Sequence, residues 1–77
     1  MAYVDYREHI IISTARYDNL SGQWKSNACI IWQGNGTERI KFLDNTPEIF
    51  SRFEDAEEAG VEHSKDWVDD EVGKVVA

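Results

Sequence analysis

The sequence predicts a small α+β domain over residues 1–77. We expect a three-stranded antiparallel β-meander followed by one C-terminal α-helix that packs on one face of the sheet. Three observations predict this fold. The first 43 residues contain three β-rich segments, turn sequences separate these segments, and small and apolar residues recur at helical spacing beyond residue 53. A chain of 77 residues has room for one domain and one core.

The predicted strands follow from β-branched residues and turn signals. The first strand covers residues 6–17, which include three consecutive isoleucines. Residues 18–22, Asp-Asn-Leu-Ser-Gly, end it, because Asp, Asn and Ser bond nearby backbone and Gly tolerates positive φ. A second strand is expected over residues 23–33 and a third over 37–43, joined by the hairpin sequence Gly-Asn-Gly at 34–36. Such short connections make an antiparallel meander.

A break at residues 44–47 precedes a helix expected over about residues 53–72. The inner stripe of this helix consists of small and apolar residues at spacings of three, four and seven: Ala56, Ala59, Gly60, His63, Ser64, Trp67 and Val68. Small residues in the stripe allow the helix axis to approach the sheet closely. Trp24 and Trp32 share one face of their strand by period 2, and we expect them beneath the helix with Trp67.

The formal net charge of −7 is unevenly distributed. Residues 1–43 hold five basic and four acidic residues, whereas residues 44–77 hold three basic and eleven acidic ones. The predicted helix therefore presents an acidic face that includes Glu57, Glu58, Glu62 and Asp66. This face is interpreted as a solvated surface, as a docking surface for a basic protein partner, or as a mimic of DNA. Binding of nucleic acid through this half would oppose phosphate repulsion.

One face of the predicted sheet is left without a covering element. Cys29 and Ile31 point to this face by period 2, and Ile11 is expected beside them. Contiguous exposed apolar surface usually marks an interface, so we expect self-association as a homodimer. Alternatively, residues 47–50, or Tyr3 and Tyr6, fold over the strip, or a different protein covers it.

The sequence offers no catalytic or metal-binding constellation. Cys29 lies in an apolar run without a basic neighbour, which is typical of a buried, inert thiol. His9 and His63 are not spaced with Cys29 as metal ligands are, and we expect His63 at the helix–sheet boundary with one nitrogen hydrogen-bonded. We therefore expect no enzyme activity, no cofactor and no metal.

These observations favour a non-enzymatic interaction or regulatory module, a homodimer whose acidic helix face meets a basic partner. The first alternative is a nucleic-acid-binding module that uses basic residues of the sheet together with Tyr17: Arg16, Lys25, Arg39 and Lys41. The second is a small enzyme or ligand carrier. The N-terminal residues have no signal-peptide pattern and no segment is apolar enough to span a membrane, so we expect a cytoplasmic location.

The helical segment resembles a pattern found in small uncharacterised bacterial proteins. It consists of Phe53-Glu54-Asp55-Ala56-Glu57-Glu58-Ala59, followed by Lys65-Asp66-Trp67-Val68-Asp69. In those proteins a few strands precede an F-x-[TD]-x-E-E-A helix that ends in a W-[IV]-D triplet. The similarity covers roughly the last third of the chain. The resemblance implies the order β-β-β-α, and it implies no activity and no functional residue.

Overall fold

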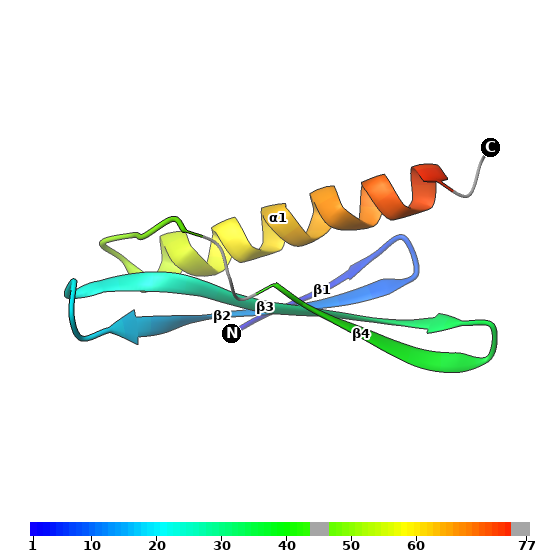
Figure 1. The fold of residues 1–77 in the computed structure, drawn as a ribbon, viewed down its shortest axis with the longest axis horizontal. Coiled ribbons are helices and arrows are strands. Elements are labelled where there is room, and N and C mark those ends of the chain that lie inside the picture. The colour runs from blue at the N-terminus through cyan, green and yellow to red at the C-terminus, as the bar shows by residue number, and fades with distance from the viewer. Residues whose placement is uncertain (44–46, 75–77) are drawn as a thin grey trace.

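A four-stranded antiparallel sheet carries one long helix on one face in the computed structural model of this protein (Figure 1). The structure describes residues 1–43 and 47–74. The sheet is a meander in which strands adjacent in the chain are hydrogen-bonded neighbours. Its strands are β1 (Ala2–Tyr6), β2 (His9–Asp18), β3 (Gln23–Gly34) and β4 (Thr37–Leu43), and the helix is α1 (Phe53–Lys74). The predicted α+β class, antiparallel meander and C-terminal helix are confirmed.

The predicted number of three strands is wrong, because residues 2–6 form an additional strand and the segment expected as one strand over residues 6–17 begins with a turn. β1 and β2 pair antiparallel around a two-residue turn formed by Arg7 and Glu8. Both residues have positive φ, 50° and 65°, as a type I′ hairpin requires. Such turns usually contain Asn or Gly, because left-handed backbone is unfavourable for other residues. The sequence therefore carries no turn signal at this position.

The two predicted turns have the expected chemistry. Asn35 and Gly36 both have positive φ, 54° and 77°, and connect β3 to β4 as a tight hairpin. Between β2 and β3, the Asp18 carboxylate accepts hydrogen bonds from the Leu20 amide at 3.1 Å and the Ser21 hydroxyl at 3.0 Å. Of the break predicted at residues 44–47, residues 44–46 lie outside the described ranges.

The middle of the helix–sheet interface is built from small residues and buried hydroxyl groups. The hydroxyl of Ser13 on β2 donates to the Glu57 carbonyl at 2.8 Å, and that of Ser26 on β3 donates to the Ala56 carbonyl at 2.6 Å. Gly60 faces the sheet here, and a Cβ added to it would come well under 3.0 Å from the Ser13 hydroxyl oxygen. The helix axis therefore lies as close to the sheet as the small-residue stripe allows.

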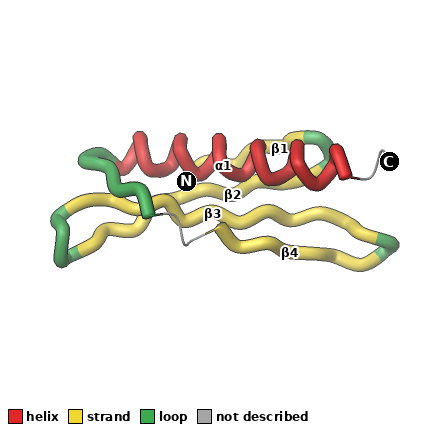
Figure 2. Tube along the Cα trace, turned by 45° about the horizontal axis from the view of Figure 1, so that its top comes forward, coloured by secondary structure: helices red, strands yellow, loops and turns green. Residues whose placement is uncertain are grey.

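Larger side chains close the two ends of this interface. Near the start of α1, the rings of Trp24 and Phe53 meet edge-on with centroids 5.3 Å apart. Near its end, Trp32 and Trp67 pack with centroids 5.2 Å apart, so the predicted location of the tryptophans beneath the helix is confirmed. The helix follows the long axis of the sheet, and β4 lies farthest from it (Figure 2). Among the described residues, the fully buried aliphatic core consists of Ile11, Ile30 and Val68.

Candidate functional site

The sheet face opposite α1, here called the open face, carries a continuous apolar patch. Residues in register across antiparallel strands share a face, and their side chains are in contact distance. Two such rows cross the sheet. One row consists of Tyr3, Ile12, Cys29 and Phe42, and the adjacent row of Asp5, Ile10, Ile31 and Ile40. The apolar patch is thus Tyr3, Ile10, Ile12, Cys29, Ile31, Ile40 and Phe42. In the ribbon of Figure 1, no described segment covers the side of the sheet opposite α1.

Of the three interface residues predicted from the sequence, two lie on the open face. Cys29 and Ile31 are part of the apolar patch. The prediction for Ile11 is wrong, because this residue faces α1 and is 0% exposed. Ile10 and Ile12 occupy the open face instead. Because three isoleucines follow one another, hydropathy alone could not decide whether Ile11 or its two neighbours face the helix.

Ile40 and Phe42, which the sequence reasoning missed, do carry a signal in the sequence. They alternate with Arg39 and Lys41 along β4, so they share a face. The structure shows them 49% and 64% exposed, and Tyr3 at the opposite edge is 67% exposed.

The segments expected to cover this strip take other positions. Phe50 pairs with Trp24 on β3 through two backbone hydrogen bonds of 2.7 and 2.8 Å. Tyr6 turns to the helix side, where its hydroxyl donates to Asp69 at 2.8 Å. Tyr3 lies within the open face as an exposed edge residue. None of these residues buries the centre of the apolar patch.

The two ends of the open face along the strand direction carry opposite net charges. Asp5 and Glu38 lie at the end where the apolar patch begins. Arg16 and Lys25 form a cross-strand pair at the other end, which also holds Asp18, 3.8 Å from Lys25, and so keeps a net charge of +1. The apolar patch therefore lies between an acidic and a basic end.

The predicted acidic face exists for three of its four residues. Glu58, Glu62 and Asp66 are exposed and recur every four residues on one side of α1. Glu57 points elsewhere, because its carboxylate lies 2.8 Å from the amine of Met1 and is largely covered. The described helix is too polar to cross a membrane.

The basic residues of the alternative nucleic-acid surface lie on two different faces. Arg16 and Lys25 project from the open face, as the register shows. Arg39 and Lys41 belong to the alternation that faces α1, but they are exposed, since β4 is the strand farthest from the helix. These four side chains do not form one basic surface.

The two histidines and Cys29 lie in separate places. His63 Nε2 is 2.6 Å from a carboxylate oxygen of Glu48, and His9 hydrogen-bonds the backbone of the first hairpin. Cys29 is on the opposite side of the sheet. Within residues 1–43 and 47–74, no three His, Cys, Asp or Glu side chains gather as metal ligands would.

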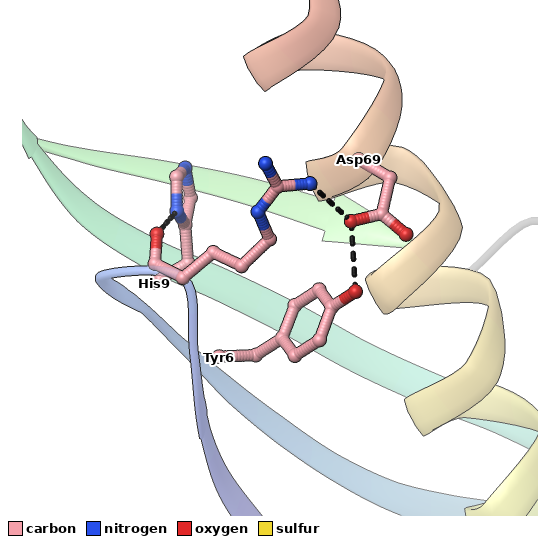
Figure 3. A network of polar contacts seen from close by, with 4 residues as sticks. Tyr6, His9 and Asp69 are labelled. Carbon is pink, nitrogen blue, oxygen red and sulfur yellow. Dashed lines mark hydrogen bonds and ion pairs between the residues drawn. The ribbon is translucent and has the colours of Figure 1, made fainter.

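The strained Arg7-Glu8 turn is held to the helix by a polar network (Figure 3). Arg7 and the Tyr6 hydroxyl both donate to the same carboxylate oxygen of Asp69, each at 2.8 Å. These bonds stabilise the ionised carboxylate, so the hydrogen bond from Arg7, followed by that from Tyr6, lowers the pKa of Asp69 below its usual range. The same bond to Asp69 raises the pKa of Tyr6. Backbone strain maintained by such contacts is a frequent feature of binding sites.

An aromatic cleft of about 200 Å³ opens beside this network. It is lined by His9 from β2, Trp32 from β3, and Trp67, Glu71 and Val72 from α1. The His9 ring packs on Trp32 with centroids 5.3 Å apart. His9 Nδ1 donates to the Arg7 carbonyl at 2.8 Å, because a carbonyl oxygen can only accept, and Nε2 is left for other partners.

No pattern in the sequence indicates this cleft. Its lining residues come from three elements and are up to 63 positions apart in the chain. Comparison of the chain with protein-family models, curated proteins and solved structures gives no match.

Proposed function

We propose that the protein is a non-enzymatic interaction module that works as a homodimer joined through the open faces of two sheets. The observation that carries this proposal is the apolar patch. Seven apolar side chains are adjacent in register on four strands, and Tyr3 and Phe42 remain 67% and 64% exposed. A contiguous apolar surface of this kind is typical of an interface.

The size of the open face supports a second copy as the occupant. Four strands spaced about 4.8 Å apart, with side chains repeating every ~6.7 Å along each strand, give a projected area of roughly 500 Å² over the whole face. Protruding side chains add to the accessible area. A specific interface buries about 800 Å² per partner, and weaker ones less than about 600 Å². The open face thus reaches the area of a modest homodimer.

The charges of the open face favour a particular arrangement of two copies. A two-fold axis across the strands reverses the strand direction of the second sheet. The acidic end with Asp5 and Glu38 then lies over the basic end with Arg16 and Lys25 of the partner copy. A two-fold axis along the strands would instead place like ends over one another. The face is therefore complementary to itself in the first arrangement.

Cys29 provides a direct probe of this arrangement. It belongs to the row Tyr3, Ile12, Cys29 and Phe42, which is the middle row of the open face. An axis through this row brings the two Cys29 residues close to each other across the interface. Packed sheets are about 10 Å apart, with interdigitating side chains, so a short bifunctional thiol reagent should bridge them.

The test is sedimentation velocity over a roughly hundredfold range of protein concentration, because self-association depends on mass action. We expect a concentration-dependent dimer for the wild-type chain. Phe42→Lys places a charge in the apolar patch, and we expect it to abolish the dimer. Leu20→Lys is the matched control, because Leu20 is 99% exposed in the β2–β3 turn, outside the open face.

A wild-type monomer throughout this range would refute the proposal, as would a Phe42→Lys chain that dimerises as well as Leu20→Lys. Cross-linking through Cys29 should join two copies in the wild-type chain and in Leu20→Lys, and it should fail in Phe42→Lys. Dimerisation through the free edge of β4 would instead leave Cys29 away from the contact, and cross-linking would then fail in all three chains.

A further inference from the structure

The aromatic cleft at the end of α1 combines indole rings with a carboxylate, a combination that the apolar patch of the open face does not have. We propose that it binds an organic cation of the trimethylammonium type, which lies against Trp32 and Trp67 beside the carboxylate of Glu71. The cleft is lined by residues of the helix side of the sheet and of α1, so it remains accessible when two open faces pack together. The inference is thus independent of the proposed dimer.

The two indole rings give the first argument. Cations are attracted to the electron-rich faces of aromatic rings within about 6 Å of the ring centroid, and tryptophan is the strongest such partner. The centroids of Trp32 and Trp67 are 5.2 Å apart and their planes are inclined by 51°. One bound group can therefore lie within reach of both rings. His9 also packs on Trp32, with the two ring planes inclined by 31°.

Charge gives the second argument. Among the described residues, Glu71 is the one carboxylate that lines the cleft. The cleft lies beside the last turns of α1, where the helix dipole places partial negative charge. The chain as a whole carries a net charge of −7, which raises the local concentration of cations. Lys74 Nζ pairs with this carboxylate at 3.1 Å from Glu71 Oε1, so it competes with any bound cation.

Size and hydration indicate which cation fits. Pockets for drug-sized ligands measure about 300–1,000 Å³, so a cleft of about 200 Å³ accommodates a single small group. A primary ammonium is a strongly hydrated point charge that needs several hydrogen-bond acceptors. The described lining of the cleft offers one carboxylate and mainly apolar surface. A methylated ammonium, which needs no acceptor and has an apolar surface of its own, matches this lining.

The indole N–H groups allow a direct test by ¹H–¹⁵N NMR. The chain contains three tryptophans, so three indole signals are expected. Choline should shift those of Trp32 and Trp67 in a saturable manner and leave that of Trp24 in place. Trp24 is the internal control, because it packs against Tyr17 and Phe53 at the opposite end of the interface.

A neutral compound of the same shape as choline separates the contribution of charge to binding from that of apolar contact. In 3,3-dimethylbutanol a carbon atom replaces the choline nitrogen, and at matched ionic strength we expect it to bind at least tenfold more weakly. Equal binding of the two compounds would refute a cation site. The absence of saturable shifts with choline up to tens of millimolar would refute it as well, as would equal shifts at all three indoles.

Three variants locate the site. Glu71→Gln keeps the shape of the side chain and should weaken choline binding several-fold. Glu62→Gln is the matched control, because it removes the same charge from an exposed position on α1 outside the cleft. Lys74→Met removes the competing ammonium and should strengthen binding several-fold. Equal effects of the two glutamine variants, or weaker binding by Lys74→Met, would contradict the proposed role of Glu71.

A further binding measurement identifies the source of the cation. The trimethylammonium group occurs in free small molecules and in methylated lysine side chains. Acetylated trimethyllysine amide should bind as choline does when the cation alone is recognised. It should bind more tightly when the cleft also contacts peptide backbone. Weaker binding than that of its unmethylated counterpart would overturn the proposal.

Discussion

Substitution of Gly60 tests most directly how closely α1 approaches the sheet. Alanine in place of glycine in a helix interior is normally favourable by about 1 kcal/mol. Here the new Cβ would come well under 3.0 Å from the hydroxyl oxygen of Ser13, which is closer than such atoms pack. The hydroxyl has to move, and it then loses its 2.8 Å hydrogen bond to the Glu57 carbonyl.

The magnitude follows from these contacts. Ser13 is 0% exposed, so water cannot replace the lost bond, and an unsatisfied buried polar group costs about 1–3 kcal/mol. Overpacking adds about 1–3 kcal/mol. After the gain of about 1 kcal/mol in helix propensity, we expect Gly60→Ala to lower the free energy of unfolding by about 1–5 kcal/mol, with a middle value of about 3 kcal/mol. One kcal/mol corresponds to about 4–8 °C in a domain of this size, so a loss of about 3 kcal/mol should lower the melting temperature by about 12–24 °C.

The control is the same substitution at Gly73. It also lies in α1, and a Cβ added there meets no atom of the described residues within 4 Å. Gly73→Ala should therefore raise the free energy of unfolding by about 0.5 kcal/mol. Thermal and urea unfolding followed by circular dichroism measure both variants. All chains are compared at one protein concentration, because self-association would make the stability depend on concentration.

The double variant identifies the contact. Ser13→Ala removes the hydroxyl that the new Cβ would meet, and the atoms that remain nearest to that Cβ lie 3.4 Å away. In this background Gly60→Ala should cost little, so the coupling between the two sites is nearly the whole cost of the single substitution, about 3 kcal/mol. Additive effects, or a Gly60→Ala chain as stable as Gly73→Ala, would refute the close approach of α1 to the sheet.

Three further predictions concern the first hairpin and the two faces of β2. Glu8→Gly should stabilise the fold by about 0.5–1 kcal/mol in urea unfolding, because Glu8 has a φ of 65° in an exposed turn; equal or lower stability would contradict this strain. The hydrogen bond from Arg7 is the largest cause of the lowered pKa of Asp69. The ion pair therefore stabilises the fold above pH 3.8, the usual value for this carboxyl, and this contribution is lost as the pH falls through the lower folded value. Asp69→Asn should accordingly reduce stability at pH 6 and weaken its loss towards pH 2; the same pH dependence in both chains would show that the pair does not stabilise the fold. Ile11→Val should lower the free energy of unfolding by about 1 kcal/mol, because Ile11 is buried beneath α1, and Ile12→Val on the open face should lower it clearly less in the monomer. A larger loss for Ile12→Val would mean that Ile12, and not Ile11, faces the helix.

The parts of the fold that were predictable are those that local patterns determine. The Asn35-Gly36 hairpin and the turn after Asp18 carry the residues their backbone geometry requires. The four-residue spacing of small side chains in α1 indicates both the helix and its buried side, and the predicted bounds 53–72 differ from Phe53–Lys74 by two residues at one end. The first hairpin could not be predicted, because its left-handed turn at Arg7 and Glu8 is held by the contacts of Tyr6 and Arg7 with Asp69 of α1.

The same distinction applies to the candidate sites. The facing of Cys29 and Ile31 is predictable, because Trp24 and Trp32 fix the alternation of β3. The facing of Ile11 is not, because the alternation of β2 depends on a hairpin that local sequence does not encode. The aromatic cleft exists only after β2, β3 and the end of α1 come together, so no spacing along the chain could indicate it.

The small-residue stripe of α1 has a consequence for the uniqueness of the fold. Ala56, Gly60, Ser64 and Val68 follow one another at intervals of one turn, so a helix displaced along its axis by about 5.4 Å would again present a narrow face to the sheet. Apolar contact alone would distinguish these positions weakly. The hydroxyls of Ser13 and Ser26 remove this ambiguity, because each bonds one particular carbonyl of the helix. A shift by one turn would also bring Ala56 or Ser64, depending on its direction, to the place where a Cβ meets the Ser13 hydroxyl. The hydrogen bonds of these two hydroxyls therefore select one axial position of the helix on the sheet among several that pack similarly.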